Sequence, residues 1–66
     1  MTVILNDKTL TVEPGTTLAQ LLDAQNIKPS GIATAVNGNV VPAVSRAETP
    51  LAEGDKIIII TAFYGG

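Results

Sequence analysis

Four consecutive isoleucines, Ile57 to Ile60, are the feature that most constrains the fold of this 66-residue chain. They lie in a run from Lys56 to Phe63 that is rich in β-branched residues, which favour strands. A strand that is apolar on both faces promotes aggregation when it lies at a sheet edge. We therefore expect this last strand to be central, paired on both sides and covered by a helix.

The first thirteen residues predict a hairpin. Val3 to Leu5 form a short apolar run, and Leu10 and Val12 alternate with polar residues, as in a half-buried strand. Asn6 and Asp7 separate the two segments, and both residue types tolerate the positive φ of a tight turn. The chain is expected to open with two antiparallel strands.

A single helix is predicted after this hairpin. Thr17 and Gln20 have the spacing of a capping box, and Asn26 and Pro29 mark the end of the helix. One apolar stripe follows helical spacing and consists of Leu18, Leu21 and Leu22. In a domain this small we assign the stripe to the core rather than to a partner.

A second hairpin is predicted in the middle of the chain. Ile32 to Val36 is expected to be a strand, and the Asn37-Gly38 pair after it is a strong hairpin signal. Val40 and Val41 then form a short strand that Pro42 ends.

The segment from Pro42 to Ala52 is interpreted as irregular. Its polar residues suggest either a binding loop or, as the simpler interpretation, a surface connection without chemistry; they are Ser45, Arg46 and Glu48. Leu51 is expected to enter the core, and Gly54 with Asp55 to form the last turn.

This order of elements predicts an α+β fold. It comprises a mixed sheet of four to five strands, one helix packed across it and the last strand in the centre, which is the β-grasp arrangement of ubiquitin. We assign residues 1–63 to this domain and residues 64–66 to a flexible tail.

Composition argues against several classes of function. Without cysteine or histidine the chain lacks disulfides, the commonest zinc ligands, a thiol nucleophile and the usual general base, so we do not expect an enzyme or a metal site. The acidic residues are scattered and are interpreted as solvated: Asp7, Glu13, Asp23, Glu48, Glu53 and Asp55. The four basic residues are dispersed and the net charge is −2, so nucleic acid is not an expected partner.

Neither a basic, apolar leader nor an apolar run of about 20 residues is present. We expect a soluble, cytoplasmic monomer without membrane contact.

Gly65 and Gly66 follow the strongly strand-forming run. They predict an unhindered terminal carboxylate on a flexible stalk that leaves the domain from its most rigid strand. Three extended residues reach roughly 10 Å, far enough to enter the active site of a partner. Glycine has no Cβ and suits a narrow channel.

The chain resembles the ThiS family, the sulfur carriers of thiamine biosynthesis. The resemblance covers the whole chain and depends on the order of short motifs: Asn6-Asp7, Val36-Asn37, Leu51, Gly54-Asp55 and the final Gly65-Gly66. It implies a protein that is not itself a catalyst.

The resemblance also implies a reaction cycle. A partner similar to ubiquitin-activating enzymes, an adenylyltransferase, uses ATP and magnesium to adenylate the carboxylate of Gly66. A sulfur donor such as a cysteine desulfurase or a rhodanese-like protein converts the adenylate to a thiocarboxylate, and thiazole synthase takes the sulfur. Gly65 provides clearance, and no cofactor is bound by the chain itself.

Phe63 and Tyr64 depart from this family pattern, in which small or aliphatic residues are expected before the glycine pair. Aromatic residues are common at the centre of interfaces, so both are candidate contacts with a partner, and Phe63 could equally end the strand as a core residue.

Three alternatives remain open from the sequence. The small subunit of molybdopterin synthase shares the fold and the chemistry but is usually longer, and a protein modifier joined to lysines uses the same activated end. A β-grasp interaction module would bind through its sheet, with incidental glycines.

Overall fold

The structure is a computed structural model that describes residues 1–61. Its elements along the chain are β1 (Thr2–Leu5), β2 (Lys8–Thr11), α1 (Leu18–Ala24), β3 (Ile32–Val36), β4 (Asn39–Val41), the 3₁₀ helix η1 (Ala43–Glu48) and β5 (Lys56–Thr61). The proposed boundary between domain and tail at residue 63 lies outside the described residues.

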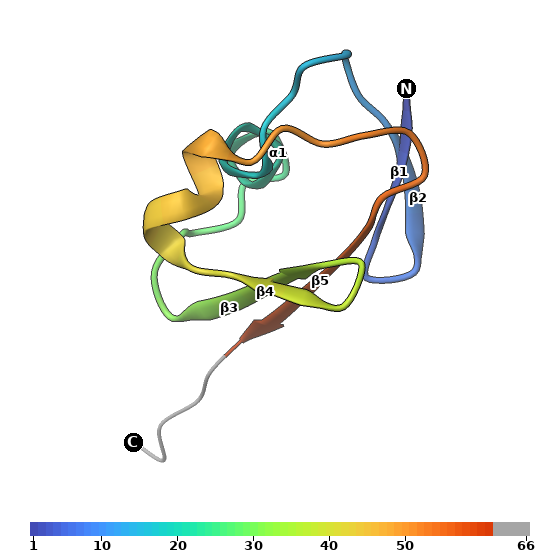
Figure 1. The fold of residues 1–66 in the computed structure, drawn as a ribbon. Helices are drawn as coiled ribbons and strands as arrows, with labels where there is room; N and C mark the ends of the chain where they lie inside the picture. The colour runs from blue at the N-terminus through green and yellow to red at the C-terminus, as the bar shows by residue number, and fades with distance from the viewer. Residues whose placement is uncertain (62–66) are drawn as a thin grey trace.

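The five strands form one mixed sheet in the order β2-β1-β5-β3-β4 (Figure 1). β5 pairs parallel with β1 and antiparallel with β3, while β2 and β4 form the edges. The prediction that the isoleucine-rich strand is central is confirmed.

Both predicted hairpins are present with their predicted turns. Asn6 and Asp7 have φ of 47° and 69°, and Asn37 and Gly38 have φ of 51° and 84°. All four values lie in the left-handed region, which asparagine, aspartate and glycine adopt at a lower cost than other residues. The turns set the registers Leu5↔Lys8 and Val36↔Asn39.

Helix α1 begins and ends through hydrogen bonds that its own sequence supplies. The Thr17 hydroxyl accepts from the Gln20 N–H at 3.2 Å, and the Gln20 side chain accepts from the Thr17 N–H at 2.9 Å, which is the predicted capping box. Asn26 takes φ of 58°, and the Ile27 N–H donates to the Leu22 carbonyl at 2.9 Å. This left-handed cap stops the helix one residue after its C-cap, Gln25.

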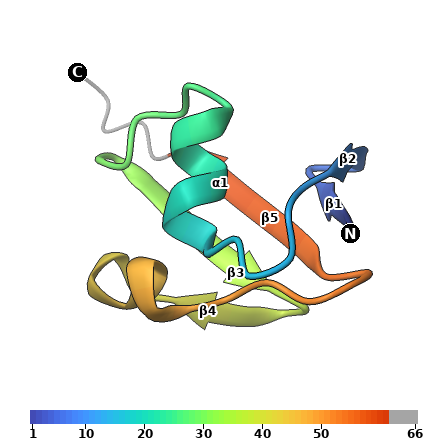
Figure 2. The same cartoon turned by 90° about the horizontal axis from the view of Figure 1, so that it is seen from above.

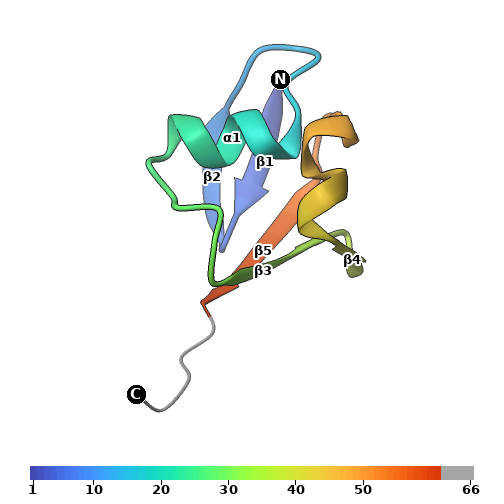
Figure 3. The same cartoon turned by 90° about the vertical axis from the view of Figure 1, so that its left-hand side faces the viewer.

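The core lies between α1 and one face of the sheet (Figures 2 and 3). The predicted leucine stripe is fully buried, and Leu51 enters the same core as expected. The contiguous buried cluster consists of Val3, Leu5, Leu18, Leu21, Leu51 and Ile57.

The two faces of β5 have different surroundings, because successive side chains of a strand point to opposite faces. Ile57 is completely buried and Ile59 packs against the core, whereas Ile58 is 38% exposed and Ile60 is 61% exposed. The expectation that the strand is paired on both sides is confirmed. The helix, however, covers only one of its faces in the described part of the chain.

The interpretation of the connection after β4 as irregular was wrong for six residues, which form η1. Pro42 is the N-cap of this helix, and its carbonyl accepts from the Ser45 N–H at 2.9 Å. The assignment of Arg46 to the surface was also wrong, because its side chain is only 4% exposed.

Arg46 joins η1 to the sheet and to the loop that precedes β3. Its guanidinium donates to Thr34 Oγ1 at 3.1 Å, to the Pro29 carbonyl at 2.8 Å and to the Ile32 carbonyl at 2.9 Å. Thr34, also buried, donates its hydroxyl to the Val41 carbonyl at 2.8 Å. The planar fork of a guanidinium suits several fixed acceptors at once.

We expect Arg46→Ala to lower the free energy of unfolding by about 3 kcal/mol, because it leaves the buried Thr34 hydroxyl and two part-buried carbonyls without their donor. Urea denaturation followed by circular dichroism measures this loss. Lys28→Ala is the control, since Lys28 is exposed and its removal should change stability by less than about 0.5 kcal/mol. Equal midpoints for the two variants would contradict the structural role of Arg46.

Candidate functional site

The residues that the sequence analysis assigned to the site lie outside the described residues. They are Phe63, Tyr64, Gly65 and Gly66. The structure does describe β5, the strand that leads to them, up to Thr61, five residues before Gly66. The described part of the candidate site is therefore the end of this strand and its surroundings.

On one side β5 is paired along nearly its whole length. The antiparallel register with β3 runs from Val36↔Ile57 to Ile32↔Thr61. On the other side the pairing with β1 is short, covering only Ile4↔Lys56 and Leu5↔Ile57. The strand is thus held more extensively by β3 than by β1.

A side chain extends the short β1 side. The Asn6 backbone N–H donates to the Ile57 carbonyl at 2.9 Å, and there β1 gives way to the hairpin turn. The Asn6 side chain then reaches the next position of β5: Oδ1 accepts from the Ile59 N–H at 2.8 Å, and Nδ2 donates to the Ile59 carbonyl at 3.3 Å.

A second asparagine contacts the opposite end of β5. Asn37 Oδ1 accepts from the Lys56 N–H at 3.0 Å, and Asn37 Nδ2 donates to Asp55 Oδ1 at 2.9 Å. Asp55 Oδ2 in turn accepts from the Ala52 N–H at 2.8 Å. Interpreting Asp55 as a merely solvated carboxylate was therefore incomplete, because it is half-buried and orders the turn before β5.

These roles of Asn6 and Asn37 were not predicted from the sequence. Both residues were assigned to turns, which is correct, but the contacts of their side chains with β5 depend on tertiary structure. An asparagine rather than a glycine at a positive-φ turn position is the only signal in the sequence that such a contact exists.

The sheet face away from α1 is apolar near the end of β5. Ile58 and Ile60 are exposed there, and the register with β3 places Ala35 and Ala33 beside them. Val40 of β4 pairs with Ala35 and is 77% exposed. We call these five residues the open apolar face.

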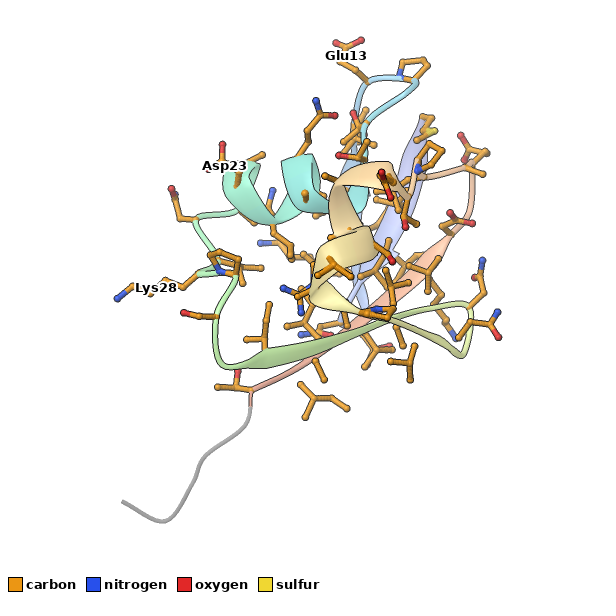
Figure 4. The ribbon with its side chains drawn as sticks, turned by 60° about the vertical axis from the view of Figure 1, so that its left-hand side comes forward. Glu13, Asp23 and Lys28 are labelled. Carbon is orange, nitrogen blue, oxygen red and sulfur yellow. The ribbon has the colours of Figure 1, made fainter. Side chains whose placement is uncertain are left out.

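The charged side chains labelled in Figure 4, Glu13, Asp23 and Lys28, point away from the domain. Among residues 1–61 no three or more histidine, cysteine, aspartate or glutamate side chains gather where they could hold a metal ion. This part of the chain also contains no helix of sufficient length and hydropathy to cross a membrane.

A groove of about 470 Å³, which was not predicted from the sequence, lies between α1 and η1. Its walls are mainly apolar and include Leu22, Ile27 and Ala47. Arg46 also lines the groove, but the three bonds of its guanidinium tie it to the fold. We therefore do not include this groove in the candidate site.

The sheet order, the single helix across one face and the central last strand define a ubiquitin-like β-grasp protein. The sequence model of the ThiS family matches residues 2–66. The chain therefore belongs to the ThiS family, and the resemblance deduced from its motifs is confirmed.

Two ThiS proteins are similar to this chain, one found by its sequence and one by its structure. The sulfur carrier protein ThiS of Escherichia coli K12 is 29% identical over 66 residues, which is the full length of both chains. The crystal structure of the thiamine biosynthesis protein ThiS from Geobacter metallireducens is 25% identical, with a TM-score of 0.83 over 100% of this chain and 99% of that one.

A more distant structure shares the fold alone. It is a ubiquitin-like protein from the archaeon Caldiarchaeum subterraneum, 19% identical with a TM-score of 0.50 over 97% of this chain and 96% of that one.

Proposed function

We propose that this protein is the sulfur carrier of a thiamine (thiazole) pathway, with the Gly66 carboxylate as the group that carries the sulfur. The observation that supports this most is the match to the ThiS family, which runs from residue 2 through Gly66 and so includes the glycine pair. The central position of β5 adds to it, because the strand that leads to this pair is held on both sides.

The chemistry begins with activation of a poor acyl donor. The Gly66 carboxylate attacks the α-phosphorus of ATP, an acyl adenylate forms and pyrophosphate leaves. A nucleophile whose sulfur is in the oxidation state of hydrosulfide then attacks the acyl carbon, giving the thiocarboxylate and releasing AMP. If the donor is a persulfide, a thiol must also supply two electrons. When thiazole synthase takes the sulfur, an oxygen atom from water or from the sulfur acceptor replaces it at the acyl carbon, and the carboxylate is regenerated.

The chain acts as a co-substrate in this scheme, and its partners supply the catalytic groups. ATP and magnesium are bound by the adenylyltransferase, and the sulfur comes from a cysteine desulfurase or a rhodanese-like protein. Gly65 gives the acyl group access to a narrow channel. Tyr64 and Phe63 are proposed contacts with the channel entrance. The cycle takes place in the cytoplasm with a monomeric carrier.

Pyrophosphate exchange tests the first step. Wild-type protein, a cognate ThiS-activating adenylyltransferase, magnesium, ATP and labelled pyrophosphate are mixed, and incorporation of label into ATP is followed. The proposal predicts exchange only when the carrier is present. No exchange with an adenylyltransferase that activates its own established carrier would contradict the proposal.

The short distance from the fold to Gly66 constrains where the partner binds. Five extended residues span about 17 Å, so a partner that holds the Gly66 carboxylate must contact the domain near the end of β5. The open apolar face extends to this end of the strand, and Ile60 is its exposed residue nearest to Thr61. We propose that the adenylyltransferase packs an apolar surface of its own against this face.

Ile60→Asp is expected to raise the KM of the carrier in the exchange assay about tenfold, because it puts a charge into an apolar contact. Val44→Asp is the matched control: Val44 is 87% exposed but lies on η1, on the opposite side of the sheet (Figure 1). It should change KM by less than about twofold. A similar KM for both variants would contradict this placement of the partner.

A further inference from the structure

The contact between Asn6 and Ile59 occupies a place where backbone pairing is missing. Backbone groups of β5 alternate between its two neighbours: the carbonyls of Asp55 and Ile57 accept from the β1 side, and the carbonyl of Lys56 accepts from the Asn37 N–H on the β3 side. By this alternation Ile59 also faces the β1 side. β1, however, has ended at Leu5, so no backbone of β1 reaches it.

The Asn6 amide replaces the missing strand residue. A carboxamide has one acceptor and two donor hydrogens, like a peptide unit with an extra N–H. The structure shows both of its polar atoms bonded to one residue of β5, at 2.8 Å to the Ile59 N–H and 3.3 Å to the Ile59 carbonyl. This two-point contact fixes the peptide groups on both sides of Ile59.

The position of the contact along the strand gives it a function beyond stability. Ile59 is two residues before Thr61 and seven before Gly66. Apart from the Asn6 side chain, the described chain makes no hydrogen bond to β5 on the β1 side after Ile57. Within the described residues, the last part of β5 is therefore held by β3 on one side and by Asn6 on the other.

We propose that Asn6 is a positioning residue for the carrier reaction: its side chain aims the outgoing strand, so that the partner captures a carboxylate whose approach is already defined. This inference rests on the proposed function. Without the Asn6 amide the end of β5 would sample more directions, and the partner would have to restrict them on binding. This cost of ordering should appear as a higher KM, since the chemistry begins only after the partner has captured the carboxylate.

Asn37 is a matched control that the chain itself offers. Like Asn6 it is the first residue of a hairpin turn, with φ of 51° against 47°, and its side chain also makes two hydrogen bonds. Those bonds hold the start of β5, at Lys56, and the turn before it. Substitution by glycine keeps both turns, because glycine adopts positive φ without strain. The variants Asn6→Gly and Asn37→Gly therefore lose the same number of contacts, the first at Ile59 in the second half of β5 and the second at the start of the strand.

The test compares these two variants with the wild-type chain in the exchange assay. Asn6→Gly is expected to raise KM about fivefold, because the partner must then order the end of β5 on binding, with kcat within about twofold of wild type. Asn37→Gly should leave KM within about twofold of the wild-type value. Urea denaturation should nevertheless show that Asn37→Gly loses about as much stability as Asn6→Gly. An unchanged KM for Asn6→Gly, or an equal rise in both variants, overturns the proposal.

A second measurement does not depend on the carrier reaction. Backbone ¹⁵N relaxation should give lower order parameters at Ile60 and Thr61 in Asn6→Gly than in wild type, and unchanged values there in Asn37→Gly. If wild-type protein supports no exchange, the proposed function fails while these order parameters still decide whether Asn6 positions the strand. Equal order parameters in all three proteins overturn the positioning role.

Discussion

A variant with one alanine added after Gly66 is expected to lose sulfur transfer by more than about 100-fold while remaining folded. The addition moves the carboxylate about 3.5 Å further along the chain and puts a methyl-bearing residue in place of the terminal glycine. Misplacement of a reacting group by about 1 Å can already cost about 100-fold in rate. Thiocarboxylate formed per minute in the presence of the adenylyltransferase and a sulfur source measures the effect.

The same variant separates the carrier from a β-grasp module that binds partners through its sheet. Its thermal unfolding should match that of wild type, because the addition follows Gly66, five residues after the last described residue of β5. If the protein is a carrier, the extended variant therefore loses sulfur transfer but is as stable as the wild type. Undiminished sulfur transfer by the extended chain would contradict the role of Gly66.

Ile57→Ala should produce the largest loss of stability among alanine substitutions in β5. Ile57 is completely buried in the core, and replacement of such an isoleucine by alanine costs about 2–5 kcal/mol. A chain of 66 residues has a total stability of roughly 3–10 kcal/mol. We therefore expect a large fraction of the variant to be unfolded at 37 °C, as measured by circular dichroism and urea titration.

Ile60→Ala is the control for this prediction, with the same chemical change three residues along the same strand. Because Ile60 is 61% exposed, its truncation should cost less than about 1 kcal/mol. Similar losses of stability in the two variants would contradict the finding that only one face of β5 is covered.

Local sequence signals predicted most of the fold because they are strong and agree with one another. The isoleucine run placed β5 at the centre, the pairs Asn6-Asp7 and Asn37-Gly38 set both hairpins, and Thr17 with Gln20 began the helix. Each signal acts over a few residues, so its structural consequence can be deduced without knowledge of the rest of the chain.

Features that depend on tertiary contacts were not predicted. Arg46 is buried because Thr34 and two carbonyls from distant segments accept its hydrogen bonds, and no local pattern reveals those acceptors. The same holds for the contact of Asn6 with Ile59, 53 residues apart in sequence. The exposure of Ile58 and Ile60 followed neither from composition nor from periodicity, since an all-apolar strand is equally suited to a sheet covered on both faces.

The two parts of the candidate site were predicted in different ways. The strand that presents the tail could be assigned from the sequence and is described by the structure. The chemical roles of Gly65 and Gly66 came from the resemblance to the ThiS family, whereas the contacts of Phe63 and Tyr64 came from the frequency of aromatic residues in interfaces. All four residues lie outside the described range.

Intact-mass analysis of the chain is the most direct test of the central claim. The protein is incubated with ATP, magnesium, a cognate adenylyltransferase and a sulfur source, and fragmentation locates any change along the chain. The account predicts that the mass rises by the difference between one sulfur and one oxygen atom, and that the change lies at Gly66. An unchanged mass with an adenylyltransferase that converts its own established carrier, or a sulfur atom located at any other residue, would contradict it.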